Sequence, residues 1–328
     1  MKSDPVLKAL ETALDRSRPD WRDRRLLVAF SGGSDSTALL LALHELLGDS
    51  GRGLLKAAHV NHGLQNEAGN WAAHCAEVAG SLDVPLEICE VEVRTDGRGM
   101  EAAARRERYA ALGRLMKPGE CLLTAHHQDD QWETLLLRML RGAGVGGLAG
   151  IRESRRCGAG WLLRPLLGVS RGDLRTWLEE TGATFVDDPS NRDTGLDRSF
   201  LRERVLPVLL ERWPGAGATA GRMARLAAET RELLLALAEI DGREIASEDS
   251  IDCAGLLALS PPRRANLLRA RLAALSIAAP SEARLNAALD MLLNAAADRH
   301  PEARWRGARL TRRRGRIYLA AVAPPDPD

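Results

Sequence analysis

The sequence is poor in aromatic residues, has almost no net charge and contains no closely spaced cysteines. Only 4% of its 328 residues are Phe, Trp or Tyr, so extensive stacking platforms for nucleic-acid bases are not expected. The 46 lysines and arginines nearly balance the 45 aspartates and glutamates, so net charge alone indicates no partner. The distribution of charge along the chain is therefore more informative than its sum.

The cysteines exclude several kinds of metal site. They are Cys75, Cys89, Cys121, Cys157 and Cys253, and no Cys-x-x-Cys pair exists, so neither a zinc ribbon nor a cysteine-ligated iron–sulfur cluster is supported. Scattered reduced thiols are typical of the cytosol. No apolar run approaches the ~18 residues of a membrane span, and the N-terminus lacks the apolar core of a signal peptide. We therefore expect a cytoplasmic protein without membrane contact.

A glycine-rich loop, Ser31-Gly-Gly-Ser-Asp-Ser36, follows the first strongly apolar run of the chain. The run, residues 26–30, predicts a buried strand, and residues 36–47 predict an amphipathic helix that ends at Gly48. Glycines let a backbone approach a ligand closely, and a helix N-terminus favours an anion. The loop therefore predicts a phosphate site, since a simple helix cap needs neither two glycines nor three serines.

This loop differs from the common nucleotide motifs. No lysine follows the glycines as in the P-loop, and the pattern is not Gly-x-Gly-x-x-Gly. Ser-Gly-Gly-x-Asp-Ser after a first strand instead resembles the PP-loop of the N-type ATP pyrophosphatases. The resemblance implies a HUP-like fold and cleavage of ATP between its α and β phosphates.

Strands alternate with helices over the first 140 residues. We expect strands at residues 26–30, 54–60, 86–93 and 121–125, and helices at residues 5–15, 36–47, 67–82, 100–116 and 128–140. Such alternation predicts an α/β fold with a doubly wound parallel sheet, and a ligand beyond the carboxyl ends of its strands. On this rule Ser31–Ser36, Asn61–Gly63 and His126–Asp130 meet at one sheet edge.

The second part of the chain is mainly helical. Helices are expected at residues 216–245, 261–274 and 281–297, and a small hairpin turns at Arg314-Gly315. We expect a first domain over residues 1–213 and a mainly helical second domain, with a small terminal β-hairpin, over residues 214–328. Seven arginines and no acid between Arg304 and Arg316 indicate either a solvated face or a nucleic-acid contact. A second basic cluster holds Arg263, Arg264, Arg269 and Arg271.

Two further segments carry chemical information. Thr124–Thr134 places Asp130 and Glu133 on one face of a predicted helix, with Asp129 beside them. Such carboxylates bind Mg²⁺ with nucleotide phosphates, or an ammonium group, although acids also favour any helix N-terminus. His126 could donate to a phosphoryl oxygen. Arg141–Gly150, with five glycines, is either a flexible linker or a mobile substrate loop.

With these motifs in order, the sequence resembles the tRNA(Ile)-lysidine synthases. The motifs are Ser31–Ser36, His59–Leu64, Glu101–Arg105 with Arg108-Tyr109, Thr124–Thr134, Arg141–Gly150, Arg164–Leu167, and Asp188–Asn191 with Arg198 and Arg202. They span about residues 25–210, and a weaker similarity to the family's helical tRNA-binding domain continues to about Leu319. The resemblance therefore implies a catalytic domain over residues 1–213 and a tRNA-binding domain over residues 214–328. Gln65 stands where arginine is usual and Ser199 where asparagine is usual. Many members carry a further C-terminal domain that is not in this sequence. The sequence would then be either a short natural form or a truncated one.

The resemblance implies a two-step reaction. The wobble cytidine of tRNA(Ile) with a CAU anticodon is adenylylated at O2 by ATP, and the amine of free L-lysine then attacks C2, releasing AMP and forming lysidine. ATP and Mg²⁺ are the implied cofactors, and a homodimer is left open.

The same resemblance assigns roles to individual residues. ATP would contact Ala29, Phe30, Ser31, Gly32, Gly33, Ser34, Asp35, Ser36 and Val60. Asp35 and Asp129 would hold the metal, and Asp130 and Glu133 the lysine. The catalytic set would be Asp35, Arg105, His126, Asp130 and Glu133, and tRNA would contact Arg198, Arg202, Arg312, Arg313 and Arg314.

Three alternatives compete with this hypothesis. A base-thiolating relative would relay sulfur through paired cysteines or an iron–sulfur cluster, which the scattered thiols do not favour. An ammonia-dependent synthetase would need a source of ammonia, and no amidotransferase domain is attached. A non-catalytic tRNA-binding protein would not need the carboxylate cluster.

Overall fold

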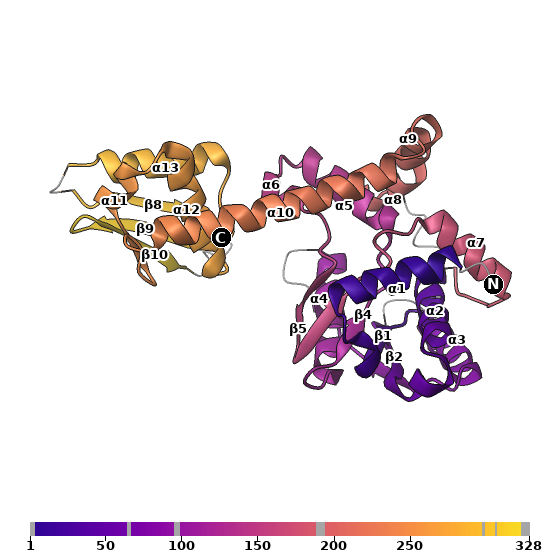
Figure 1. The fold of residues 1–328 in the computed structure, drawn as a ribbon. Coiled ribbons are helices and arrows are strands. Elements are labelled where there is room, and N and C mark those ends of the chain that lie inside the picture. The colour runs from indigo at the N-terminus through magenta and orange to yellow at the C-terminus, as the bar shows by residue number, and fades with distance from the viewer. Residues whose placement is uncertain are drawn as a thin grey trace. The chain divides into compact units, whose positions relative to one another are not determined.

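The computed structural model describes residues 4–63, 67–94, 99–187, 194–296, 299–305 and 307–322 (Figure 1). The chain divides into two compact units, Met1–Ala227 and Ala228–Asp328. The division falls inside the long helix α10 (Ala216–Gly242), whereas the predicted boundary at Trp213-Pro214-Gly215 lies just before it. The expectations for Gln65 and for Asp188–Asn191 lie outside the described residues. None of the helices in the described ranges is both long and apolar enough to cross a membrane.

A six-stranded sheet in the order β3-β2-β1-β4-β6-β5 forms the centre of the first unit. The strands are β1 (Leu26–Ala29), β2 (Leu55–Asn61), β3 (Leu86–Glu90), β4 (Cys121–Leu123), β5 (Ser154–Cys157) and β6 (Gly160–Leu163). All neighbours are parallel except β5, which pairs antiparallel with β6. The predicted doubly wound sheet is confirmed, with the order reversing between β1 and β4, where such sheets bind ligands.

Helices cover both faces of this sheet because successive strand residues point to opposite sides. Leu26 and Val28 of β1 pack in a core with α1 (Pro5–Ser17) and α2 (Ser34–Gly51). Leu27 instead packs against Leu112 of α4 (Met100–Leu115) on the other face. The first face also receives α3 (Ala68–Ser81) and α7 (Arg171–Thr181). α2 departs from helical geometry at the predicted Gly48, with φ +56°, before one more turn.

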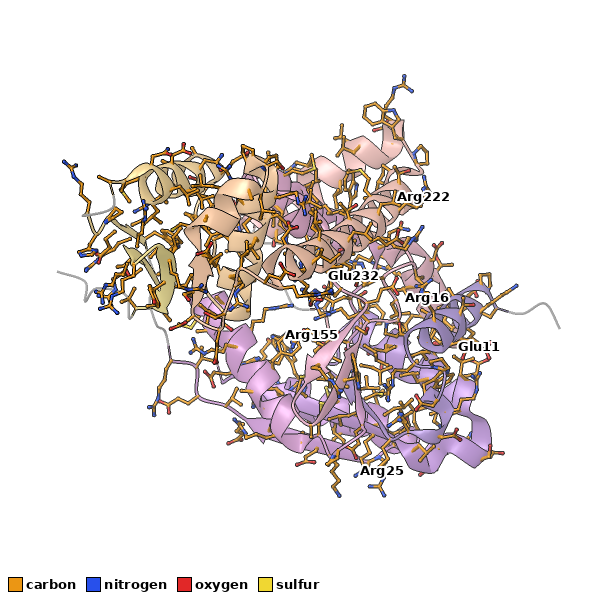
Figure 2. The ribbon with its side chains drawn as sticks, turned by 60° about the vertical axis from the view of Figure 1, so that its left-hand side comes forward. Glu11, Arg16, Arg25, Arg155, Arg222 and Glu232 are labelled. Atoms are coloured by element: carbon orange, nitrogen blue, oxygen red, sulfur yellow. The ribbon has the colours of Figure 1, made fainter. Side chains whose placement is uncertain are left out.

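The remaining elements of this unit are short, apart from α5 (Gln128–Leu140). They are the helices α6 (Val145–Leu148), α8 (Asp197–Phe200) and α9 (Leu206–Arg212), a π-helical turn (Leu201–Val205), and 3-10 turns (Trp21–Asp23 and Arg52–Leu54). On the outer side of α1, Glu11 and Arg16 face solvent (Figure 2), where Arg16 forms an ion pair of 2.8 Å with Glu153 before β5. This contact fastens the β5–β6 hairpin, which was not predicted, to the N-terminal helix.

The second unit is a four-stranded antiparallel sheet with helices on one face. The strands are β7 (Ser250–Asp252), β8 (Glu302–Trp305), β9 (Ala308–Arg313) and β10 (Arg316–Ala321), in the order β7-β10-β9-β8. The helices are α11 (Cys253–Ala258), α12 (Pro261–Ala274) and α13 (Glu282–Asn294). The predicted hairpin is β9–β10, whose turn residues Arg314 and Gly315 have φ +47° and +73°, as a two-residue hairpin turn requires. The strands β7 and β8 were not predicted.

Candidate active site

The glycine loop closes on itself before α2 begins. The Ser36 hydroxyl donates to the Gly33 carbonyl at 3.0 Å and accepts from the Ser31 N–H at 3.2 Å. No side chain caps α2, whose N-cap is Gly33. The N–H groups of its first turn therefore stay available for an anion, which the helix dipole also favours.

Position 32 requires glycine for two reasons, its backbone conformation and the lack of space around it. Its φ is +81°, and a Cβ built there would lie 2.9 Å from the Cys75 sulfur. Cys75 is fully buried and lies 3.3 Å from His59 Nδ1, and burial raises the pKa of its thiol to about 12. The Gly32 carbonyl accepts from the Val186 N–H at 2.9 Å. The loop thus rests on a sulfur atom that leaves no room for a side chain.

The glycine loop borders a cavity of about 590 Å³ at the carboxyl ends of β1, β2 and β4. The predicted site residues in its wall are Ala29, Phe30, Ser31, Gly33, Asp35, Ser36, Val60, Arg105, His126, Asp130 and Arg198. Other predicted residues of this unit, Gly32, Ser34, Asp129, Glu133 and Arg202, lie outside the lining. The three segments expected at one sheet edge do meet, because Asn61 and Gly63 also line the cavity. Arg312–Arg314 belong to the second unit.

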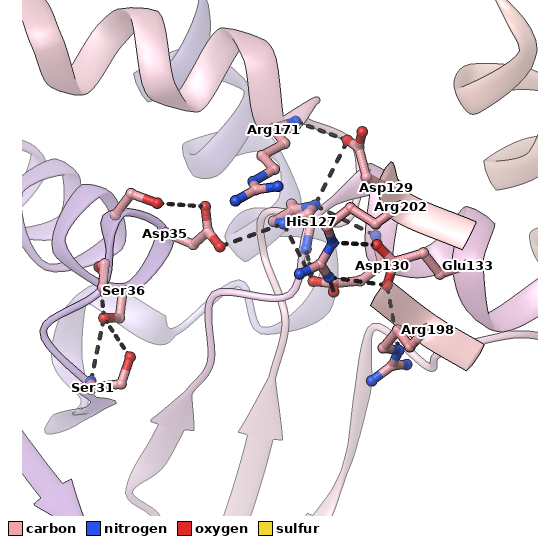
Figure 3. A network of polar contacts seen from close by, with 12 residues as sticks. Ser31, Asp35, Ser36, His127, Asp129, Asp130, Glu133, Arg171, Arg198 and Arg202 are labelled. Atoms are coloured by element: carbon pink, nitrogen blue, oxygen red, sulfur yellow. Dashed lines mark hydrogen bonds and ion pairs between the residues drawn. The ribbon is translucent and has the colours of Figure 1, made fainter. Parts of the chain in front are cut away.

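His127, which the sequence did not single out, stands between the loop and the acidic cluster (Figure 3). Its Nε2 lies 3.5 Å from Asp35 and 3.6 Å from Asp130, and its Nδ1 lies 3.7 Å from Asp129. The side chain is 2% exposed. Burial alone would lower its pKa, but the carboxylates of Asp130 and Asp35 raise it above the usual value.

The same histidine is the N-cap of α5. Its backbone N–H donates to the Asp130 carboxylate at 3.0 Å, and its Nδ1 accepts from the Asp130 N–H at 3.4 Å, which completes a capping box. When the imidazole is neutral, we assign its proton from this hydrogen bond to Nε2, on the side of Asp35.

Asp129 faces away from the cavity. Its carboxylate accepts from the Arg171 N–H, at the start of α7, at 2.8 Å. It lies near Nδ1 of His127, whereas Asp35 lies near Nε2 of the same ring. Among the described residues no group of three or more His, Cys, Asp or Glu side chains is arranged to hold a metal ion. Magnesium commonly uses one or two carboxylates together with nucleotide phosphates. Asp35, in the cavity wall beside the loop, suits that mode.

His126 is neutral at physiological pH. Burial is the main cause that lowers its pKa, to about 3, and the charges of Arg164 and Arg105 act in the same direction, while Asp130 opposes them. Its Nδ1 lies 2.9 Å from the Thr124 hydroxyl. A neutral imidazole in the cavity wall can donate one hydrogen bond without carrying a charge.

Glu133 lies behind the cavity wall and is fully buried. Arg202 donates to both of its oxygens, from Nε at 2.7 Å and from Nη2 at 3.0 Å, and Arg198 Nε lies 3.3 Å away. Burial raises the pKa of Glu133 although Arg202 acts against it. Arg202 Nη2 also lies 3.5 Å from Asp130. Of the two predicted lysine contacts, Asp130 reaches the cavity, and Glu133 anchors the two arginines.

Arg105 of α4 contributes a positive charge to the cavity wall. The Arg105 guanidinium lies 5.1 Å from the centre of the Tyr109 ring, and Arg155 of β5 lies 5.0 Å from the same ring. Both Arg105 and Tyr109 line the cavity. This wall places a guanidinium beside the space that faces the phosphate loop.

The glycine-rich segment after α5 is held against that helix. Arg138 donates from Nη1 to the carbonyls of Gly147, at 2.7 Å, and Gly150, at 2.8 Å. Gln131 accepts from the Ile151 N–H at 2.5 Å and donates to its carbonyl at 3.2 Å. The segment lies wholly within the first unit, so it is not a linker between the two units.

The sheet, the glycine loop and the cavity define a PP-loop ATP pyrophosphatase. Residues 6–209 match the PP-loop domain family, and residues 251–318 match the TilS substrate binding domain family. A tRNA(Ile)-lysidine synthase of Alkalilimnicola ehrlichii is 45% identical over 301 residues, covering 91% of this chain and 67% of that protein. Another, of Pseudomonas putida, is 41% identical over 319 residues, covering 92% and 74%. The chain belongs to the tRNA(Ile)-lysidine synthase family.

A solved structure shares the fold at low sequence identity. It is the U34-tRNA thiolase NcsA from Methanococcus maripaludis with its [4Fe-4S] cluster, with a TM-score of 0.54 and 15% identity, covering 68% of this chain and 79% of that one. At this identity the similarity concerns the fold alone.

Proposed function

We propose that this chain is an ATP-dependent ligase that joins L-lysine to the wobble cytidine of tRNA(Ile) with a CAU anticodon, forming lysidine. The observation that carries the proposal is that the glycine loop, His126, Asp130, Arg105 and Arg198 line one cavity. Family membership supports the same reaction. Base thiolation by cysteine pairs is disfavoured, because the five cysteines do not pair.

In the first step, O2 of the cytidine attacks the α-phosphate of ATP, and the bond to pyrophosphate breaks. Negative charge then grows on the leaving pyrophosphate, and the uncapped N–H groups at the start of α2 stabilise it there. Arg105, which also lines the cavity, adds a positive charge. Mg²⁺ bound by Asp35 and the phosphates would neutralise part of the phosphate charge.

In the second step, the lysine amine attacks C2 and AMP leaves. Asp130 is in the cavity wall, and although burial opposes it, His127 and His126 lower the pKa of Asp130 below its usual value. An ionised carboxylate attracts the lysine ammonium and orients the amine toward the base. His126, neutral and adjacent, donates or accepts one hydrogen bond at the reacting group.

The test combines ATP, labelled lysine and a tRNA(Ile) transcript with a CAU anticodon. Label should enter this transcript, and pyrophosphate and AMP should be released in equal amounts. A methionine tRNA with the same anticodon is the control and should stay unlabelled. Absence of label from the isoleucine transcript, with folded protein and saturating ATP, would overturn the proposal.

A further inference from the structure

Arg105, Tyr109 and Leu112 lie on one side of the helix α4, because residues three, four and seven apart share a helix face. Leu112 is buried in the core on this side of the sheet, and Tyr109 is half-buried and packs against that core. Tyr109 and Arg105 both line the cavity. The ring is therefore held by the core, whereas Arg105 is an exposed side chain.

Among the residues that the structure describes, the hydrogen-bonding and ring contacts of Arg105 are with Tyr109. The guanidinium carbon lies 5.1 Å from the ring centre, and Nη2 lies 3.5 Å from the hydroxyl, which is too far for a strong hydrogen bond. A guanidinium this close to an aromatic ring is attracted to its electron-rich face. An exposed arginine otherwise samples many rotamers, so the ring restricts where this charge lies.

Two further arginines approach the same ring. Arg155 of β5, labelled in Figure 2, lies 5.0 Å from its centre. Arg164, directly after β6, is 6% exposed and donates from Nη1 to the Arg152 carbonyl at 2.7 Å. Burial is the main cause that lowers the pKa of Arg164, and Tyr109 acts against it. The charges of Arg155 and Arg105 lower this pKa further, as expected for cations that lie close together.

The three cations repel one another, and within the described ranges no ion pair joins any of them to a carboxylate. Repulsion from Arg155 and Arg164 favours rotamers of Arg105 that point away from this wall, toward solvent. The attraction of the Tyr109 ring opposes that movement. A positive charge stabilises a transition state most when it is in place before the reaction begins. The ring therefore matters for where the Arg105 charge stands, as well as for packing.

We propose that Tyr109 is a positioning residue, which holds the Arg105 guanidinium in the cavity wall before ATP and the cytidine bind. The proposal rests on the proposed function, in which Arg105 adds a positive charge as pyrophosphate leaves. The alternative is that Tyr109 only packs against the core beside Leu112. Its effect would then be on stability, and it would not depend on Arg105.

The test is a double-mutant cycle on the rate of pyrophosphate release, with saturating ATP and tRNA(Ile) transcript. Y109L should lower kcat about tenfold, the scale of one cation–π contact in a partly desolvated site, and leave the KM for ATP within twofold. R105A should lower kcat about 100-fold, the scale of one lost electrostatic contact to a transition state. Y109L/R105A should be no slower than R105A, because Tyr109 acts through Arg105.

Two further variants separate the ring from the hydroxyl and from general effects of losing a tyrosine. Y109F should retain most of the wild-type kcat, because it keeps the ring. The matched control is Y318L, since Tyr318 is the other tyrosine of the sequence and is also half-buried, on β10. Its kcat should stay within twofold of wild type. A wild-type kcat in Y109L, or a further loss when Y109L is added to R105A, would overturn the proposal.

A measurement on the wild-type chain keeps the proposal testable if Y109L does not fold, and it needs no activity. An aromatic ring shifts the NMR signals of protons above its face upfield, so the Arg105 side chain should give upfield signals in arginine-labelled protein. R105K identifies these signals by their disappearance, and Y109F should preserve the shift. Unshifted Arg105 signals would contradict the contact. Failure of the wild-type chain to form lysidine would refute the proposed function, while the shift would still decide whether Tyr109 holds Arg105.

Discussion

The imidazole of His127 lies 3.5 Å from the carboxylate of Asp35, and so connects the N-cap of the acidic helix α5 to the phosphate loop. Burial opposes ionisation of Asp35, yet His127 and the charge of Arg171 lower its pKa below the usual value. The two motifs expected at one sheet edge are thus in direct electrostatic contact.

Asp35→Asn should slow pyrophosphate release by about 100-fold, the scale of one lost electrostatic contact to a transition state. The reason is that Asp35 is the carboxylate beside the loop in the cavity wall. Binding of tRNA should stay within twofold. Asp49→Asn, on the same helix but with a side chain 91% exposed, is the control and should behave as wild type. An active Asp35→Asn enzyme would refute the role assigned to this carboxylate.

His127→Asn should destabilise the fold by about 3 kcal/mol near pH 6, because it leaves the carboxylates of Asp35, Asp129 and Asp130 without their shared partner. The folded state raises the pKa of His127, so its contribution is complete below the unfolded pKa of ~6.5 and is lost as pH rises through the folded value. Urea unfolding at several pH values measures this. The exposed His300→Asn should change little, and equal losses in both variants would contradict the ion pairs.

His126→Asn should have the opposite pH signature. The folded pKa of about 3 lies below the unfolded value, so its contribution is present above pH ~6.5 and is lost as pH falls toward 3. The variant should therefore lose less stability than wild type between pH 7 and pH 5. Proton NMR of the ring should show no titration of His126 in that range. A His126 resonance that titrates near pH 6.5 would be incompatible with the neutral ring.

Glu133→Gln should cost about 3 kcal/mol of stability, because Arg202 and Arg198 would lose a buried carboxylate. Adding Arg202→Met should recover part of this loss, since the unpaired guanidinium is then removed. A double-mutant cycle from thermal or urea unfolding gives the coupling energy. Additive losses would show that the two side chains do not interact as the distances indicate.

Arg138→Ala should release the glycine-rich segment, because one nitrogen of Arg138 holds the carbonyls of both Gly147 and Gly150. Amide hydrogen exchange over residues 142–150 should speed up by about tenfold or more. Arg141→Ala is the control, since that exposed side chain pairs with Asp197 and does not touch the loop carbonyls. Unchanged exchange in Arg138→Ala would show that other contacts hold the segment.

Sequence patterns predicted the regular parts of the fold well. Helices α5 and α12 begin and end at the expected residues, because capping residues and proline mark their starts and apolar periodicity marks their lengths. The strands β5, β6, β7 and β8 were missed because all four are short. Three of them are also rich in polar residues, and a pattern such as Ser154-Arg-Arg-Cys157 shows no alternation of its own. Such strands form because they hydrogen-bond to the edge of a neighbouring strand.

The parts of the site that follow the carboxyl ends of parallel strands were predictable from the sequence, and the other parts were not. Ser31–Ser36 and His126–Asp130 follow strands, so their meeting follows from topology alone. The roles of His127 and Arg202 depend on partners distant in sequence: Glu133, for example, is 69 residues from Arg202. Two adjacent histidines with opposite pKa shifts also look alike in a sequence, because only burial and neighbours distinguish them.

The sulfur of Cys75 beneath Gly32 has a chemical consequence. A thiol with a pKa of about 12 is almost wholly protonated at neutral pH, and nucleophilic or oxidative attack proceeds through the thiolate. The loop therefore rests on a cysteine that alkylating agents and peroxide attack slowly. An added oxygen atom on that sulfur would need the space beside Gly32 that a Cβ also cannot occupy. Resistance to oxidation at this buried position thus preserves the shape of the ATP loop, although no part of the reaction uses the thiol.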